Sequence, residues 1–310
     1  MYKLAAIVGP TAVGKTSIAI KVARELNGEI ISCDSMQIYK GMDIGTAKAS
    51  EEEQAKVGHH LIDIVEADRQ FSVADYQKLA VKLIEKLNGE NKLPILVGGT
   101  GLYYQSVVDS YVFFPMQSRD RVREKWNAII KEKGLEAVYH YLQSIDPEYA
   151  EKISSNDQKR IVRALEVYEL TGKTFSSHQM KKENAYDLAV VGLYLERQDL
   201  YSRIEQRVDK MLQDGLIEEV EYLREQGYDL SNNSMQALGY KQVYYYLQGF
   251  INKEEMIEEI KKETRRYAKR QYTWFKKDRR ILWLNIKAFA DDKLLAKKIV
   301  SYWKGVLYRA

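Results

Sequence analysis

A glycine-rich segment at residues 9–16 directly follows an apolar run at residues 4–8 and precedes a stretch with helical periodicity at residues 17–26. The segment reads GPTAVGKT and matches the pattern G-x-x-x-x-G-K-[ST] in full. Its glycines allow backbone N–H groups to surround phosphate oxygens, and the following helix directs its positive end to the same place. The chain is therefore expected to contain the strand–loop–helix unit of nucleotide-binding and ATP-binding proteins.

Two side chains of this loop have predicted tasks. Lys15 supplies a point charge to the terminal phosphate, and the Thr16 hydroxyl is placed to reach a metal ion. We therefore expect Mg²⁺ as a cofactor and Thr16 as its protein ligand. The motif leaves open which phosphate compound is bound and whether phosphate is transferred at all.

Strand and helix patterns alternate in the first hundred residues. Strands are expected at residues 29–32 and 93–97, and Ser72 is expected to cap a helix between them. This alternation predicts an α/β fold whose parallel sheet is flanked by helices. Ligands of such sheets bind beyond the carboxyl ends of the strands, so the phosphate loop should share one crevice with residues 34–37 and 98–101.

The pattern becomes entirely helical after about residue 118, with helices expected at residues 120–133, 135–144 and 157–171. Asn156 is expected to cap the last of these helices and Gly172 to end it. Strand-like runs return at 187–195 and 281–284, and long helical stretches at about 199–226 and 253–277. We predict a P-loop NTPase-like core of residues 1–114 and 187–310, interrupted by an all-helical insertion domain of residues 115–186.

Composition excludes several classes of protein. The chain has no apolar run of about 18 residues, so no transmembrane helix is expected. The first strand begins at once, which leaves no room for a signal peptide. The single cysteine, Cys33, excludes an intramolecular disulfide and a cysteine-based zinc finger. These features indicate a cytoplasmic protein, with a monomer as the default state.

Positive charge is concentrated near the C-terminus. The net charge is +4, but residues 260–280 contain ten basic and two acidic residues, so this segment carries +8 and the rest of the chain −4. Tyr267 and Tyr272 lie within it and are suited to stacking on unpaired bases. The segment is equally consistent with a polyanionic partner and with a solvated helix face.

Asp34 is the acidic residue at a strand end, whereas the strand at 93–97 is followed by no carboxylate. Asp34 is therefore interpreted as a base, as a second-sphere group for Mg²⁺ or as a turn cap. Arg203 and Arg207 are one helical turn apart and are suited to binding phosphate, although their spacing favours a surface salt bridge with Glu205 or Asp199.

Taken together, the motifs resemble those of the bacterial tRNA dimethylallyltransferases, also called tRNA isopentenyltransferases. The resemblance runs in order from residue 9 to about residue 284. The chain lacks the C-terminal zinc finger of the eukaryotic members and is similar to the compact bacterial type. The segments that carry the resemblance are 9–16, 32–48, 59–63, 97–103, 156–173, 203–207, 238–241 and 269–275.

The resemblance implies transfer of a dimethylallyl group from dimethylallyl diphosphate to N6 of the adenine 3′-adjacent to the anticodon in tRNA. The phosphate loop would then hold a departing diphosphate, with Lys15, Mg²⁺ and Arg207 stabilising its charge, and Asp34 would accept the amine proton. The adenine must be flipped out of the anticodon stem-loop, at a cost of a few kcal/mol.

Site residues follow by similarity to the same family. Catalytic roles fall to Asp34, Thr16, Arg207 and Thr100. Diphosphate is expected to contact Gly9, Thr11, Ala12, Val13, Gly14, Lys15 and Thr16. tRNA is expected to contact Asp34, Ser35, Met36, Gln37, Thr100, Arg123, Gln158, Lys159, Arg160, Ile161 and Val162.

Three other functions stay open at this point. An adenylate isopentenyltransferase of the cytokinin type shares the phosphate loop and the allyl chemistry, but it does not explain the basic insertion around Arg160 and Arg163. A P-loop small-molecule kinase or NTPase is disfavoured by the missing carboxylate after residue 97. A non-catalytic RNA-binding module leaves the complete phosphate loop unexplained.

Overall fold

The computed structural model describes residues 1–113, 119–178 and 185–308. The chain divides into two compact units, one formed by Met1–Val108 with Asn184–Ala310 and the other by Asp109–Glu183. These boundaries lie a few residues before the positions 115 and 186 that the sequence suggests. Across the described residues, no helix combines the length and the apolar character needed to cross a membrane.

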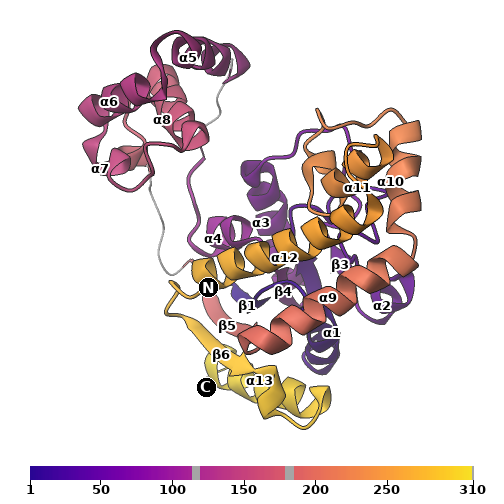
Figure 1. The fold of residues 1–310 in the computed structure, drawn as a ribbon. Coiled ribbons are helices and arrows are strands. Elements are labelled where there is room, and N and C mark those ends of the chain that lie inside the picture. The colour runs from indigo at the N-terminus through magenta and orange to yellow at the C-terminus, as the bar shows by residue number, and fades with distance from the viewer. Residues whose placement is uncertain (114–118, 179–184, 309–310) are drawn as a thin grey trace. The chain divides into compact units, whose positions relative to one another are not determined.

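The first unit contains the predicted parallel sheet with helices on both faces (Figure 1). Its six strands have the order β3-β2-β4-β1-β5-β6, and all adjacent pairs are parallel. This observation confirms the expected fold class. The strands are β1 Lys3–Val8, β2 Gly28–Ser32, β3 His59–His60, β4 Leu93–Gly98, β5 Asp187–Tyr194 and β6 Ile281–Asn285.

Alternation along β1 separates two cores. Ile7 faces a buried cluster shared with α1 and α13, whereas Ala6 faces a cluster shared with α3 and α4. A third cluster joins α9, α10, α11 and α12. The helices of this unit are α1 Lys15–Glu25, α2 Glu51–Lys56, α3 Val73–Gly89, α4 Gly101–Val108, α9 Arg197–Gln213, α10 Leu216–Glu225, α11 Tyr240–Leu247, α12 Lys253–Phe275 and α13 Asp292–Leu307.

The helices that border the candidate site are α9 and α12, which pack on each other and run side by side in front of the strands (Figure 1). α12 begins with a capping box formed by Asn252 and Glu255. The expectation of one helical stretch at about 199–226 is wrong, because Gly215 has φ 103° and separates α9 from α10. A left-handed glycine at this point ends one helix and allows the chain to change direction.

The second unit is helical, as its sequence pattern predicts. It contains α5 Arg119–Lys133, α6 Leu135–Ile145, α7 Pro147–Ala150 and α8 Gln158–Thr171. The short α7 was missed, although Asp146 before Pro147 is a local start signal, and its side chain accepts a hydrogen bond from the Tyr149 N–H. Asp157, not Asn156, caps α8 by accepting from the Arg160 N–H at 3.1 Å. Gly172 ends α8 in the left-handed conformation, as predicted.

Candidate functional site

A cavity of about 580 Å³ lies where β1, β2 and β4 end, with α9 and α12 as its other walls. The crevice predicted at the strand ends is therefore present in the first unit. Of the predicted site residues, the cavity is lined by Thr11, Ala12, Gly14, Lys15, Thr16, Asp34, Ser35, Met36, Gln37 and Arg207.

The phosphate loop has the expected backbone form. Gly14 is left-handed, with φ 92°, and α1 begins at Lys15. A Cβ atom on Gly9 would lie 2.4 Å from the backbone oxygen of Leu193, so only glycine allows the loop to pass this close to β5. Gly9 does not itself line the cavity, and Val13 is buried in the core with 1% exposure. Val13 is thus limited to contributing its backbone N–H.

Lys15 is held inside the loop by its own backbone. Its Nζ donates to the carbonyl oxygens of Gly9 at 3.0 Å and Pro10 at 2.8 Å. Burial and, after it, the positive charge of Arg207 lower the pKa of Lys15 to about 8, while the negative charge of Asp34 opposes the shift. The site therefore contains a cation that a bound anion would stabilise.

Asp34 closes a turn, which is one of its predicted roles. Its Oδ1 accepts a hydrogen bond from the Met36 N–H at 2.9 Å, which closes a tight turn after β2. The residue also lines the cavity, and its charge acts on both Lys15 and Arg207. A carboxylate has a second oxygen that can accept a hydrogen bond, so its predicted role as a base stays a prediction.

Thr100 supports the loop that carries Asp34. Its Oγ1 accepts from the backbone N–H of Ser35 at 3.1 Å, and its own N–H donates to the Cys33 carbonyl at 3.1 Å. Its predicted contact with a substrate stays a prediction.

Arg207 lines the cavity, and burial lowers the pKa of its guanidinium while Asp34 opposes that shift. The salt bridges predicted from spacing are wrong, because the two acids have other partners. Glu205 pairs with Arg265 at 2.8 Å and Asp199 pairs with Lys287 at 2.5 Å. Arg207 is consequently available to bind an anion.

Sequence reasoning predicted Gln37 but missed the residues that hold its part of the cavity wall in place. The Gln37 amide donates to the carbonyls of Thr46 at 3.2 Å and Ala47 at 3.3 Å, and accepts from Ser32 at 2.9 Å. The loop at 43–45 is fixed in turn by Glu219, whose carboxylate accepts three backbone N–H groups at 2.8–3.1 Å. No local signal links Glu219 to residues more than 170 positions earlier.

The second unit has its own basic hollow, formed on α5 and α8. Glu166 has no exposed surface and pairs with Arg123 at 3.0 Å and Arg163 at 2.8 Å. This buried carboxylate fixes the guanidinium groups of Arg123 and Arg163 at the wall of the hollow. The hollow is lined by Arg123, Asn127, Ser154, Asn156, Asp157, Gln158, Lys159, Val162 and Arg163.

Two predicted tRNA contacts on α8 differ from the rest. Ile161 has 0% exposure and belongs to the core of the second unit, so its side chain cannot contact RNA in this structure. A contact of Ile161 with tRNA is thus left to its backbone. Arg160 lies beside the hollow, with its side chain 55% exposed and paired with Asp157 at 3.3 Å.

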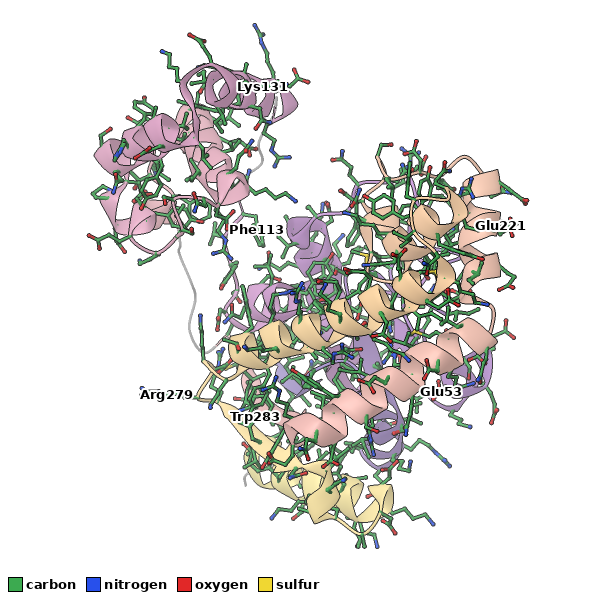
Figure 2. All side chains as sticks on the ribbon, in the orientation of Figure 1. Glu53, Phe113, Lys131, Glu221, Arg279 and Trp283 are labelled. Atoms are coloured by element: carbon green, nitrogen blue, oxygen red, sulfur yellow. The ribbon has the colours of Figure 1, made fainter. Side chains whose placement is uncertain are left out.

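Neighbouring acids neutralise part of the basic segment at residues 260–280. Three of its basic residues pair with acids outside the segment: Lys261 with Asp209 at 2.7 Å, Arg265 with Glu205 at 2.8 Å and Lys262 with Glu259 at 3.0 Å. The local charge is therefore smaller than the sequence count of +8. Arg270 lines the cavity, and Arg279 projects away from the ribbon beyond the end of α12 (Figure 2).

Comparisons with known proteins agree on one family. The model of the IPP transferase family matches residues 37–278. The tRNA dimethylallyltransferase of Syntrophomonas wolfei is 68% identical over 305 residues, which cover 98% of both sequences. A tRNA isopentenylpyrophosphate transferase from Bacillus halodurans has a similar structure, with a TM-score of 0.76, 43% identity, and coverage of 99% of this chain and 97% of that one. A eukaryotic dimethylallyltransferase acting on tRNA aligns with a TM-score of 0.83 at 28% identity, covering all of this chain and 81% of that one.

Proposed function

The chain belongs to the IPP transferase family, and from this premise we propose that it transfers a dimethylallyl group from dimethylallyl diphosphate to tRNA. The acceptor is N6 of the adenine 3′-adjacent to the anticodon, and diphosphate is released. The observation that carries this proposal is one cavity in which a phosphate loop, the Asp34 carboxylate and the Arg207 guanidinium meet. A cytoplasmic location follows from tRNA as the substrate.

The reaction breaks one bond and forms another within the cavity. The bond between the allylic carbon and the diphosphate oxygen breaks, and a bond from that carbon to N6 forms. The exocyclic amine is a poor nucleophile because its lone pair is delocalised into the ring. Stabilising the departing diphosphate is therefore the main task, and it falls to backbone N–H groups of the phosphate loop, Lys15 and Arg207.

Asp34 takes up the proton that N6 loses. Its Oδ1 is occupied by the Met36 N–H, so the second oxygen accepts the proton. A carboxylate that is fixed in this way needs no further rearrangement to act as the base.

The Thr16 hydroxyl, which lines the cavity in the phosphate loop, fits a Mg²⁺ ion whose other ligands are mainly substrate oxygens and water. Mg²⁺ prefers oxygen ligands and is often held by one or two protein groups together with waters and substrate phosphates. When bound, it would supply positive charge to the diphosphate oxygens.

Binding of dimethylallyl diphosphate should weaken as pH rises through about 8. Burial is the main cause that lowers the pKa of Lys15 to about 8. Below that pH the Lys15 ammonium is charged and stabilises the bound anion. Above that pH Lys15 is mostly neutral, so binding of the anion also requires Lys15 to take up a proton. We expect the dissociation constant to rise up to about tenfold per pH unit.

Calorimetric titration between about pH 7 and pH 9.5 measures this dissociation constant. Lys15→Arg, which keeps its charge, is the control and should remove the dependence; a flat wild-type profile would contradict the role of Lys15.

The basic hollow of the second unit is proposed to bind the tRNA backbone. Lys159→Ala or Arg160→Ala should weaken tRNA binding and reduce the slope of log K against log salt by about 0.7–0.9, because each contact with a phosphate releases counterions. Filter binding at several salt concentrations measures the slope. Lys125→Ala is the matched control, since Lys125 is exposed and pairs with Glu169 outside the hollow. Equal slopes for wild type and variants would refute the contact.

The cellular test of the function uses tRNA itself. In a strain without this gene, mass spectrometry of tRNA nucleosides should show adenosine in place of the prenylated nucleoside. The intact gene should restore the modification. Unchanged nucleosides in the deletion strain, with no second enzyme of this kind present, would exclude the proposed function.

A further inference from the structure

The side-chain amide of Gln271 lies between the two loops that carry the proposed reaction. Gln271 belongs to α12 and is 5% exposed. Its Oε1 accepts from the backbone N–H of Thr11 at 2.8 Å, and its Nε2 donates to the backbone carbonyl of Gly99 at 3.0 Å. One side chain therefore joins the phosphate loop after β1 to the loop after β4.

Gly99 provides the space for this amide. A Cβ atom on Gly99 would lie 2.1 Å from the Gln271 Nε2, which is closer than such atoms approach. A buried amide needs partners at both of its ends, so the two hydrogen bonds determine which way the group is turned. The Thr11 N–H, which in a simple phosphate loop would be available to the ligand, is used here to anchor the loop to α12.

The connection continues toward Asp34 through Tyr267, one helical turn earlier on α12. The Tyr267 hydroxyl interacts with the side chains of Gln271 and Thr100. Thr100 accepts from the backbone N–H of Ser35 at 3.1 Å, and Ser35 directly follows Asp34. Polar contacts thus connect the phosphate loop, through α12, to the residue beside Asp34.

We propose that Gln271 is a positioning residue that sets the spacing between the phosphate loop and the loop that carries Asp34. This inference rests on the proposed function, in which the first loop holds dimethylallyl diphosphate and the second meets the adenine. Transfer between two bound molecules depends steeply on their separation, because a misplacement of about 1 Å can cost about 100-fold in rate. Each loop binds its own substrate through other groups, so Gln271 acts on the transfer step more than on binding.

Gln271→Met keeps the length of the side chain and removes the amide. At saturating substrates we expect kcat to fall about 10- to 100-fold, while the KM values for tRNA and dimethylallyl diphosphate stay within about threefold of wild type. Tyr267→Phe removes only the hydroxyl between Gln271 and Thr100, and it should lower kcat about fivefold. Thr273→Ala, on the exposed face of the same helix turn, is the control and should behave as wild type.

Thermal unfolding of every variant accompanies the kinetics. Wild-type kcat in Gln271→Met overturns the proposal, and so does a loss confined to KM. If Gln271→Met does not fold, Tyr267→Phe decides, and wild-type kcat in that variant overturns the proposal. The wild-type protein is assayed first: if it forms no prenylated tRNA, the proposed function fails, whereas a normal wild type with an unaffected variant removes only the role of Gln271.

Discussion

Asp34→Asn should lower turnover by about 10²- to 10⁴-fold while the dissociation constant for tRNA stays nearly unchanged. Asparagine keeps an oxygen that accepts from the Met36 N–H, so the turn after β2 is retained. What it loses is the ability to take a proton from N6. Single-turnover assays with labelled dimethylallyl diphosphate measure the transfer step, and filter binding measures the affinity for tRNA.

Asp68→Asn serves as the matched control for this substitution, because Asp68 is an exposed acid of the same unit and does not line the cavity. It should retain full activity. Asp34→Ala should be as slow as Asp34→Asn and less well ordered, since it also loses the turn. Wild-type turnover in Asp34→Asn would remove Asp34 from the mechanism, whereas a parallel loss of tRNA affinity would make it a binding residue.

Arg207→Met should lower kcat by about 10²- to 10³-fold, the range seen when one donor to a developing anion is removed. Arg207 lines the same cavity as the phosphate loop, so its guanidinium is suited to binding the diphosphate charge. Arg207→Lys should restore part of the rate, because an ammonium retains the charge without the two-pronged geometry.

The same variant has a second readout. The charge of Arg207 contributes to the lowered pKa of Lys15, so Arg207→Met should raise that pKa and move the weakening of ligand binding to a pH above about 8. Arg197→Met, on an exposed face of α9, is the control. A raised KM with an unchanged kcat would show that Arg207 binds the ground state only, and an unmoved pH profile would contradict its proximity to Lys15.

Local sequence signals predicted the parts of the fold that depend on neighbouring residues. The phosphate loop, the strand β1 before it and the end of α8 at Gly172 each depend on a few adjacent side chains. Strand-end position and helical spacing singled out Asp34 and Arg207, the family resemblance gave them roles, and the structure brings both into one cavity. The family assignment is confirmed by the match to residues 37–278.

Contacts between distant parts of the chain were not predictable in this way. Gln271 reaches Thr11 across 260 positions, and no periodicity or cap signals such a pair. The hydrogen bond between Thr100 and the backbone of Ser35 was not predicted either. Ile161 was included with its neighbours on α8, but a helix turns successive side chains in different directions, and this one faces the core.

Charge counting had a related weakness. The basic segment at residues 260–280 carries +8 in the sequence, yet two acids of α9, Glu205 and Asp209, pair with it across the helix contact. Sequence distance hides such pairs, so net charge in a segment overstates the field that a partner meets.

The most direct test of the central claim is a purified assay with labelled dimethylallyl diphosphate in which tRNA and AMP are offered separately and together. The account predicts label on tRNA alone, attached to N6 of the adenine 3′-adjacent to the anticodon, with one diphosphate released per group transferred. Label on AMP with none on tRNA, or hydrolysis of ATP without use of dimethylallyl diphosphate, would contradict it.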